Sequence, residues 1–375
     1  MRSAQGRRAA SPPPPGRTRP SSSRHWPRRI ARGSRILEIA AAALGAVVLT
    51  VIFLPSGSGA PADPVPVEQP DLNVAVVPAA DSAGFFVALH QGIFARRGLR
   101  VRFVPAVSSE TVIDAQALGE PGDRVDISCG NYVSYIQAQQ AWDQGQRPSP
   151  ASRGVIAADL DIFAEGSVME PGAQGLYVMP GSPIRDLGSL EGETIGVNAP
   201  GNILYLLAAS VLAEHGISPG AVRFAYYPLP EMAATLKAGK IDAAVLPEPF
   251  ASQAELAYGV VPLADLDQGA TTAFPVQGCA VTKEWAAAHP GTLAAFRAAF
   301  EQGQQIADTS RAAVEQAMEA LPPPLGVTKV TAAVMALDSY PFGPVDAVRV
   351  QRVADDMREF LAFPRFDVRQ MLTGG

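Results

Sequence analysis

This chain is poor in the residues that most often carry catalysis. Its 375 residues include two cysteines and four histidines, and charged residues make up 18% of the sequence. The histidines His25, His90, His215 and His289 are isolated, and none has a second ligand at helical spacing, so the sequence predicts no zinc site. The net charge of −6 and the lack of a basic face with interleaved aromatic residues argue against nucleic-acid binding.

Signatures of nucleotide chemistry and of acyl transfer are also missing. The sequence contains no glycine-rich loop ending in Lys-Ser or Lys-Thr, no dinucleotide fingerprint after its first predicted strand, and no Gly-x-Ser-x-Gly elbow. We therefore expect no cofactor, no metal and no enzymatic activity.

The N-terminal part of the chain differs from the rest. Residues 1–35 are rich in Arg, Pro and Ser without apolar periodicity, which predicts a disordered basic extension. Residues 36–54 are almost continuously apolar and follow several arginines, so we expect export and a location outside the cytoplasm. A cleaved signal peptide and a retained membrane anchor both fit this segment. Residues 55–71 are expected to form a Pro-rich linker.

The remaining chain contains two units with the same order of predicted strands and helices. One unit has strands at 72–77, 101–105 and 125–129 with a helix at 85–97, and the other has strands at 194–198, 222–227 and 241–246 with a helix at 202–215. Two such units predict two similar α/β lobes, each a mostly parallel sheet flanked by helices. Ligands of open α/β sheets bind at the carboxyl ends of the strands. We therefore expect a binding cleft between the lobes.

The chain should cross between the lobes twice. We expect residues 72–180 and 273–375 to form the first lobe and residues 181–272 to form the second, with a two-strand hinge near 176–180 and 274–278. The other predicted elements are strands at 154–163 and 276–282, and helices at 132–142, 285–307, 311–321, 328–337 and 344–360.

Several segments, in their order and spacing, carry a resemblance to a known family. They include Leu72-Asn-Val-Ala-Val-Val-Pro, Val125-Asp-Ile-Ser, Leu190-Glu-Gly-Glu-Thr-Ile-Gly-Val and Gly239-Lys-Ile-Asp-Ala-Ala-Val-Leu-Pro-Glu-Pro-Phe. Together, over residues 72–360, they resemble the solute-binding proteins of ABC importers, in the branch that binds nitrate, taurine, aliphatic sulfonates and the pyrimidine precursor of thiamine. The resemblance implies a type II periplasmic-binding fold, capture of a small solute, and delivery to a membrane permease driven by an ATPase.

Two other classes of protein fit the same fold. One is an enzyme, either a dehydratase or a pyrimidine synthase; export argues against the former, and the absence of a cysteine-rich iron motif argues against the latter. The other is a membrane-tethered ligand sensor, which would have no partner permease encoded nearby.

Candidate ligand contacts lie in the loops after the predicted strands, where helix N-termini attract polar ligand atoms. They are Ala80, Asp81, Ser82, Ser108, Ser109, Gly130, Asn131 and Tyr132 in the first lobe, and Asn198, Gly201, Asn202, Pro230, Glu248 and Phe250 in the second. Helix capping is the alternative role for the Ser and Asn residues, and packing is the alternative for Phe250. These loops contain no Arg or Lys, so neutral or heteroaromatic solutes gain weight over nitrate and sulfonates.

Two pairs of residues complete the expectations. Asp126 and Asp242 begin corresponding strands away from the expected cleft, so we interpret them as structural. The topology implied by the resemblance places segment 276–282 antiparallel beside 125–129, which would make Cys129 and Cys279 neighbours. A disulfide and a pair of free buried thiols both fit that placement.

Overall fold

The computed structural model describes residues 66–119, 124–149 and 156–372. The chain divides into two units, and all the described residues belong to the second, Pro61–Gly375. The predicted basic extension, the apolar segment and most of the linker therefore lie outside the described residues. Within the described ranges, no helix is both long enough and apolar enough to cross a membrane.

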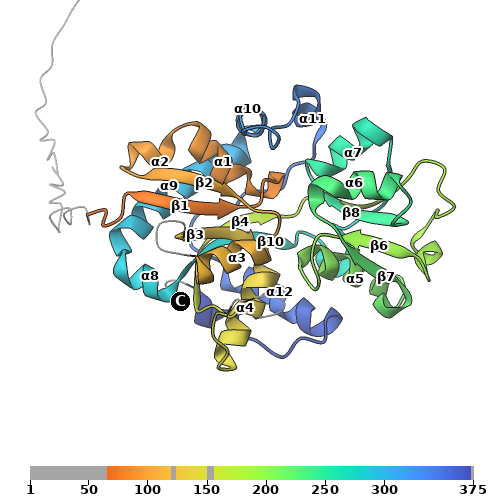
Figure 1. The fold of residues 1–375 in the computed structure, drawn as a ribbon, viewed down its shortest axis with the longest axis horizontal. Helices are drawn as coiled ribbons and strands as arrows, with labels where there is room; N and C mark the ends of the chain where they lie inside the picture. The colour runs from red at the N-terminus through yellow and green to blue at the C-terminus, as the bar shows by residue number, and fades with distance from the viewer. Residues whose placement is uncertain (1–65, 120–123, 150–155, 373–375) are drawn as a thin grey trace, which may run out of the picture. The chain divides into compact units, whose positions relative to one another are not determined.

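Two five-stranded sheets with equivalent strand orders form the body of the second unit (Figure 1). The first sheet has the order β2-β1-β3-β10-β4, and the second has the order β7-β6-β8-β5-β9. The strands of the first sheet are β1 (Asp71–Val76), β2 (Arg100–Pro105), β3 (Ile127–Asn131), β4 (Leu160–Val168) and β10 (Pro275–Thr282). Those of the second are β5 (Gln174–Val178), β6 (Thr194–Val197), β7 (Arg223–Tyr226), β8 (Ala243–Pro247) and β9 (Val261–Asp265). The predicted fold class, two α/β lobes of one topology, is confirmed.

Both sheets have a parallel core and one antiparallel insertion. Strands β2, β1 and β3 run parallel, and β10 pairs antiparallel with β3 and β4. Strands β7, β6 and β8 correspond to them, and β5 pairs antiparallel with β8 and β9. The inserted strands are β5, which follows the first crossing of the chain between the sheets, and β10, which follows the second. Each crossing therefore leads directly into a paired strand.

The repeat extends to single hydrogen bonds. The Asp126 carboxylate accepts a hydrogen bond of 2.8 Å from the backbone N–H of Asn73, and the Asp242 carboxylate accepts one of 2.9 Å from the N–H of Thr194. In each lobe the aspartate joins the start of the third parallel strand to the start of the first. Their predicted structural role is therefore confirmed by equivalent contacts in the two lobes.

Helices cover both sheets. They are α1 (Ala83–His90), α2 (Ile93–Arg96), α3 (Ser109–Leu118), α4 (Tyr132–Asp143), α5 (Ile203–Glu214), α6 (Leu229–Lys237), α7 (Phe250–Tyr258), α8 (Lys283–Ala288), α9 (Pro290–Thr309), α10 (Arg311–Glu319), α11 (Lys329–Val334) and α12 (Ala347–Phe360). Two predicted helices are each split in two. The first breaks at Gly92, whose φ of 67° is left-handed, and the second breaks before Pro290, which lacks the N–H that a continuous helix would need.

The crossing between the sheets differs from the predicted one. Strand β4 begins at Leu160 and continues to Val168 instead of ending at 163, because it pairs with β10 as far as Val168. The buried Glu165 of this strand forms an ion pair with Arg349 at 3.1 Å. Strand β5 then pairs within the second sheet. The first crossing therefore lies between Val168 and Gln174, before the predicted 176–180. No local sequence pattern marks the boundary between the lobes. Strand β5 belongs to the second sheet because it pairs with β8 and β9 there.

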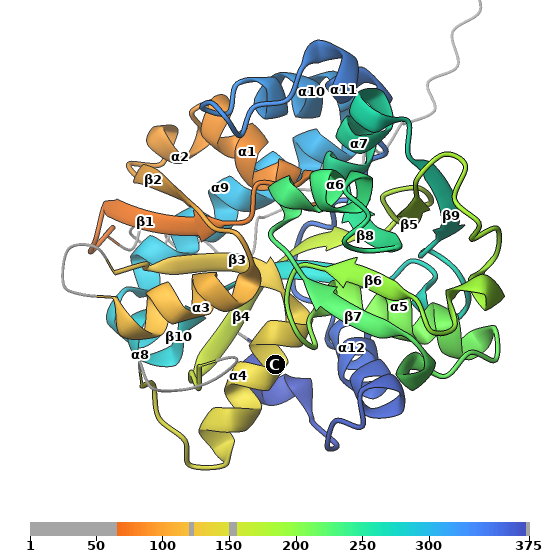
Figure 2. The same ribbon diagram turned by 45° about the vertical axis from the view of Figure 1, so that its right-hand side comes forward.

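Apolar packing is continuous across the two lobes. One buried cluster contains Tyr132 of α4, Leu207 of α5 and Val353 of α12, so α12 packs against helices of both lobes (Figure 2). A second cluster belongs to the first lobe and includes Phe94 and Phe296, whose stacked rings lie 4.8 Å apart. The predicted placement of the last helix in the first lobe alone is therefore incomplete.

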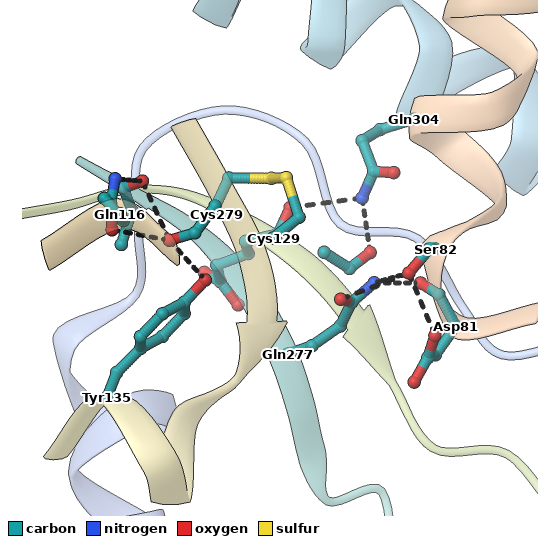
Figure 3. Close-up of a disulfide and its surroundings, with 12 residues drawn as sticks. Asp81, Ser82, Gln116, Cys129, Tyr135, Gln277, Cys279 and Gln304 are labelled. Atoms are coloured by element: carbon teal, nitrogen blue, oxygen red, sulfur yellow. Dashed lines mark hydrogen bonds between the residues drawn. A yellow bond between two sulfur atoms is a disulfide. The ribbon is translucent and has the colours of Figure 1, made fainter. Parts of the chain in front are cut away.

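The two cysteines are neighbours, as predicted, and they form a disulfide (Figure 3). Cys129 on β3 lies directly opposite Cys279 on β10, with the Cα atoms 4.1 Å apart. The two residues are separated by 150 positions, and the loop that the bond closes contains the whole second sheet. Both side chains are 1% exposed.

We expect the double variant Cys129→Ala/Cys279→Ala to lose about 3–5 kcal/mol of unfolding free energy, because a long closed loop restricts the unfolded chain strongly. Urea unfolding of residues 61–375 under oxidising conditions measures this loss. A reducing agent should destabilise the wild type and leave the variant unchanged. Equal midpoints for wild type and variant would contradict the prediction.

Candidate functional site

A cavity of about 30 Å³ lies between the lobes, at the carboxyl ends of the parallel strands. It is lined by Val77, Ala79, Asp81, Ser109, Gly130, Asn131, Val276 and Gln277 of the first lobe, and by Gln174, Asn198, Ile203, Leu204, Leu229 and Pro247 of the second. Larger hollows exist elsewhere, including one of about 630 Å³ beside α12. We assign the site to the smaller cavity because both lobes contribute equivalent strand ends and helix starts to it.

Five of the predicted site residues line this cavity. Asp81 lies in the turn before α1, Ser109 begins α3, Gly130 and Asn131 end β3, and Asn198 follows β6. The backbone N–H of Asn131 donates a hydrogen bond of 2.9 Å to the Ser109 hydroxyl, which ties two of the cavity-lining loops together. A Cβ atom at Gly130 would lie 2.7 Å from that hydroxyl oxygen, so this position requires glycine.

Of three other predicted residues near helix starts, two are side-chain caps and one is not. The Ser108 hydroxyl accepts a hydrogen bond from the Thr111 N–H in a capping box at α3. The side-chain oxygen of Asn202 caps α5 by accepting a hydrogen bond from the N–H of Tyr205, and the Asn202 NH₂ group donates to the side-chain oxygen of Asn198. Helix capping was the alternative role for Ser82, but its hydroxyl contacts Asp81 and Gln277 instead, and α1 has no side-chain cap.

The remaining predicted residues do not line the cavity. Tyr132 is 0% exposed in the core, Phe250 packs against two apolar clusters, and Pro230 is exposed at the start of α6. Ala80, Gly201 and Glu248 instead take part in hydrogen bonds between the lobes. The N–H of Ala80 donates to the Glu248 carbonyl at 2.9 Å, and the Gln137 amide on α4 donates to the Gly201 carbonyl at 2.8 Å.

The Glu248 side chain forms a second link between the lobes. Its carboxylate accepts a hydrogen bond of 2.7 Å from the Ser252 hydroxyl and one of 3.2 Å from the N–H of Ala336, which belongs to the first lobe's C-terminal segment. Burial raises the pKa of Glu248, and these hydrogen bonds oppose the rise. Glu248 therefore acts at the rim of the cleft, where it joins α7 to the end of α11.

Sequence reasoning missed two glutamines on the crossing strands. Gln277 lies on β10, and its amide donates hydrogen bonds of 2.6 Å to the Asp81 carbonyl and 3.0 Å to the Ser82 hydroxyl (Figure 3). Gln174 begins β5, opposite Pro247, and is 2% exposed. Both sit inside strands rather than in loops after them, so the expectation that strand ends supply all contacts overlooked them. A polar side chain in an otherwise apolar crossing strand was the signal available in the sequence.

Asp81 is the charged residue of the cavity wall. Burial between the lobes raises its pKa to about 6, although hydrogen bonds from the Ser82 hydroxyl and N–H oppose the shift. Asp338 lies close enough to repel it, and burial followed by repulsion from Asp81 raises the pKa of Asp338 well above its usual range. The tyrosine Tyr340 beside them is neutral, because burial and both carboxylates raise its pKa.

Comparison with known proteins agrees with this α/β fold. Residues 65–321 match the NMT1-like family over more than half of the chain, and the chain belongs to that family.

One curated relative is the bicarbonate transport ATP-binding protein CmpC of Synechocystis sp. (strain ATCC 27184 / PCC 6803 / Kazusa). It is 28% identical over 254 residues, which cover 64% of this chain and 36% of the relative. The chain therefore spans little more than a third of that protein's length.

Three solved structures share the fold. The alkanesulfonate-binding protein SsuA from Xanthomonas axonopodis pv. citri has a TM-score of 0.64 at 19% identity, over 82% of this chain and 99% of its own. The nitrate-binding protein NrtA from Synechocystis PCC 6803 has a TM-score of 0.60 at 17% identity, over 71% and 70%. The desulfurization enzyme DSZB has a TM-score of 0.56 at 15% identity, over 80% and 96%. The same fold thus occurs in binding proteins and in an enzyme.

We expect stability to depend on the Asp81 proton. The folded protein binds this proton more tightly than the unfolded chain, so its contribution to unfolding free energy rises as the pH falls from about 7 to about 4. Asp81→Asn should remove that part of the dependence and stabilise the protein near neutral pH by about 1–3 kcal/mol. Urea unfolding of wild type and variant across this pH range measures the difference.

Asp186→Asn is the matched control, because hydrogen bonds from the Ser189 hydroxyl and N–H lower the pKa of Asp186. This replacement should destabilise the protein near neutral pH, the opposite sign to Asp81→Asn. An Asp81→Asn variant less stable than wild type near neutral pH would show that the Asp81 carboxylate is satisfied as it stands.

Proposed function

We propose that this chain is the extracytoplasmic solute-binding component of an ABC importer. It captures a small solute between its lobes and delivers it to a membrane permease driven by an ATPase. The observation that carries the proposal is the cavity at which the strand ends of two equivalent lobes meet, with the chain crossing twice beside it. The ABC-transport and solute-binding names of the relatives add support.

The disulfide supports a location outside the cytoplasm. Disulfides form and persist in oxidising compartments, and Cys129 and Cys279 are bonded in this structure. The apolar segment at 36–54, with arginines before it, provides a signal for export. We propose the periplasm or the outer face of the cytoplasmic membrane, with that segment either removed or retained as an anchor.

The described lining of the cavity lacks the nucleophile and adjacent base that covalent catalysis needs. Among its described residues, Ser109 supplies a hydroxyl, but its oxygen is engaged by the N–H of Asn131, and no histidine or cysteine lines the cavity beside it. A nucleophile needs an adjacent base. The enzyme DSZB shares the fold, so the distinction rests on these side chains rather than on the fold.

Uptake of a solute requires the lobes to separate. A cavity of about 30 Å³ has room for little more than water, and hydrogen bonds such as Ala80–Glu248 and Gln137–Gly201 connect the lobes across it. Rotation about the crossings before β5 and before β10 would break these bonds while keeping each sheet intact. Capture is then the step in which the lobes close around a solute and both contribute contacts to it.

We expect ligand-free protein in solution to be more open than this structure. Small-angle scattering of residues 61–375 should give a radius of gyration larger than that calculated from the coordinates. It should contract when a solute that raises the melting temperature is added at saturation. The Gln137→Ala variant loses one bond between the lobes and should bind that solute several-fold more weakly. A radius of gyration unchanged by any stabilising solute would argue against capture by closure.

A further inference from the structure

The described lining of the cavity contains one ionisable acid and no basic side chain. Asp81 is the acid, and its carboxylate receives a hydrogen bond of 3.1 Å from the Ser82 hydroxyl. No ion pair to Asp81 forms within the described parts of the chain. An ionised carboxylate in a confined site without a cationic partner is costly, and a ligand that donates hydrogen bonds would satisfy it.

The second lobe presents an acceptor to the same cavity. Gln174 lines this cavity and is only 2% exposed. Its side-chain Oε1 atom accepts no hydrogen bond from the described residues. A buried amide oxygen without a donor costs free energy comparable to a lost hydrogen bond. Asp81 and Gln174 come from different lobes, so one ligand between the lobes is positioned to satisfy both.

Four helix N-termini near the cavity offer few free donors, and a fifth, the uncapped start of α1, lies two residues after Asp81 and therefore beside its carboxylate. The side chains of Ser108, Asn131 and Asn202 already accept hydrogen bonds from the first turns of α3, α4 and α5. At α6 the second residue is Pro230, which has no N–H to donate. With these N–H groups engaged or absent, the unpaired polar groups that remain in the described cavity wall are acceptors, which favours ligands that donate hydrogen bonds.

We infer that the cleft recognises a small uncharged or cationic solute through its hydrogen-bond donors, and that Asp81 and Gln174 are the acceptors that select it. The inference rests on the proposed solute-binding function and specifies its ligand class. A free oxyanion, of the kind named for the relatives of known fold, would place a second negative charge near Asp81 with no Arg or Lys to pair with it. This chain would therefore differ from them in the charge of its solute.

The test compares two sets of solutes by thermal shift on residues 61–375, the compact unit that contains both sheets and both cores. Nitrate, bicarbonate and ethanesulfonate as sodium salts form the oxyanion set. Ethylammonium and acetamidinium as chlorides, together with cytosine, form the donor set. At equal millimolar concentrations near neutral pH, we expect members of the donor set to raise the melting temperature and the oxyanions to leave it unchanged.

Variants then assign the effect to the cavity. Asp81→Asn and Gln174→Leu should each weaken binding of the stabilising donor solute by about 10- to 100-fold, measured by calorimetric titration. Glu231→Gln is the matched control, because Glu231 is an exposed carboxylate in the first turn of α6 that does not line the cavity. Its affinity should equal that of the wild type. Melting temperatures without solute establish that each variant is folded.

Two outcomes overturn the inference in distinguishable ways. An oxyanion that stabilises the wild type, and binds more tightly to Asp81→Asn, would show that the cleft binds anions despite Asp81; solute capture would then stand and the ligand class would fall. Stabilisation by neither set, or binding that survives both cavity variants unchanged, would remove the cleft assignment together with the proposed function.

Discussion

The pairing of β3 with β10 is the constraint on which the rest of this structure depends. The chain leaves the first sheet, builds the second lobe, and returns to lie against β3, where the Cys129–Cys279 bond joins the two strands. Beside the bond, Gln116 donates to the Ala280 carbonyl at 3.2 Å, and Tyr135 donates to the Ser128 hydroxyl at 3.1 Å. The second lobe is thereby held at both ends by one fixed register, and that register also sets the positions of the cleft residues on each strand.

Hydrogen bonds hold the loops of the cleft in place, whereas two polar side chains in its described wall lack a matching partner. Its backbone loops are tied by capping and cross-loop hydrogen bonds, and Gln277 fixes the turn that carries Asp81 to a strand of the sheet. Within the described residues, the Asp81 carboxylate has no cationic partner and the Gln174 side-chain oxygen has no donor. Several buried polar atoms of the described residues have no partner, and Gln174 is the residue among them that lines the cavity. At this position a bound ligand would supply the missing partner.

Local sequence signals were accurate where the interactions that decide structure are themselves local. The parallel strands, the caps at Ser108 and Asn202, and the equivalent aspartates Asp126 and Asp242 follow from short-range chemistry repeated in both lobes. Errors arose where distant partners decide. The extent of β4 depends on its pairing with β10, which lies far along the chain. Tyr132 and Phe250 follow strands, as ligand contacts would. Tyr132 is instead buried in the apolar core, and Phe250 packs against it.

The sequence by itself determined that this protein has two α/β lobes of one pattern, because apolar periodicity and glycine positions specify strands, helices and their order. It also placed five residues of the cavity wall, since the ends of parallel strands meet at one sheet edge. Only the tertiary structure decided that Gln174 and Gln277 join them, that β5 belongs to the second sheet, and that the cysteines are bonded. These features depend on which strands become neighbours, and strand pairing between distant segments leaves no mark in local sequence.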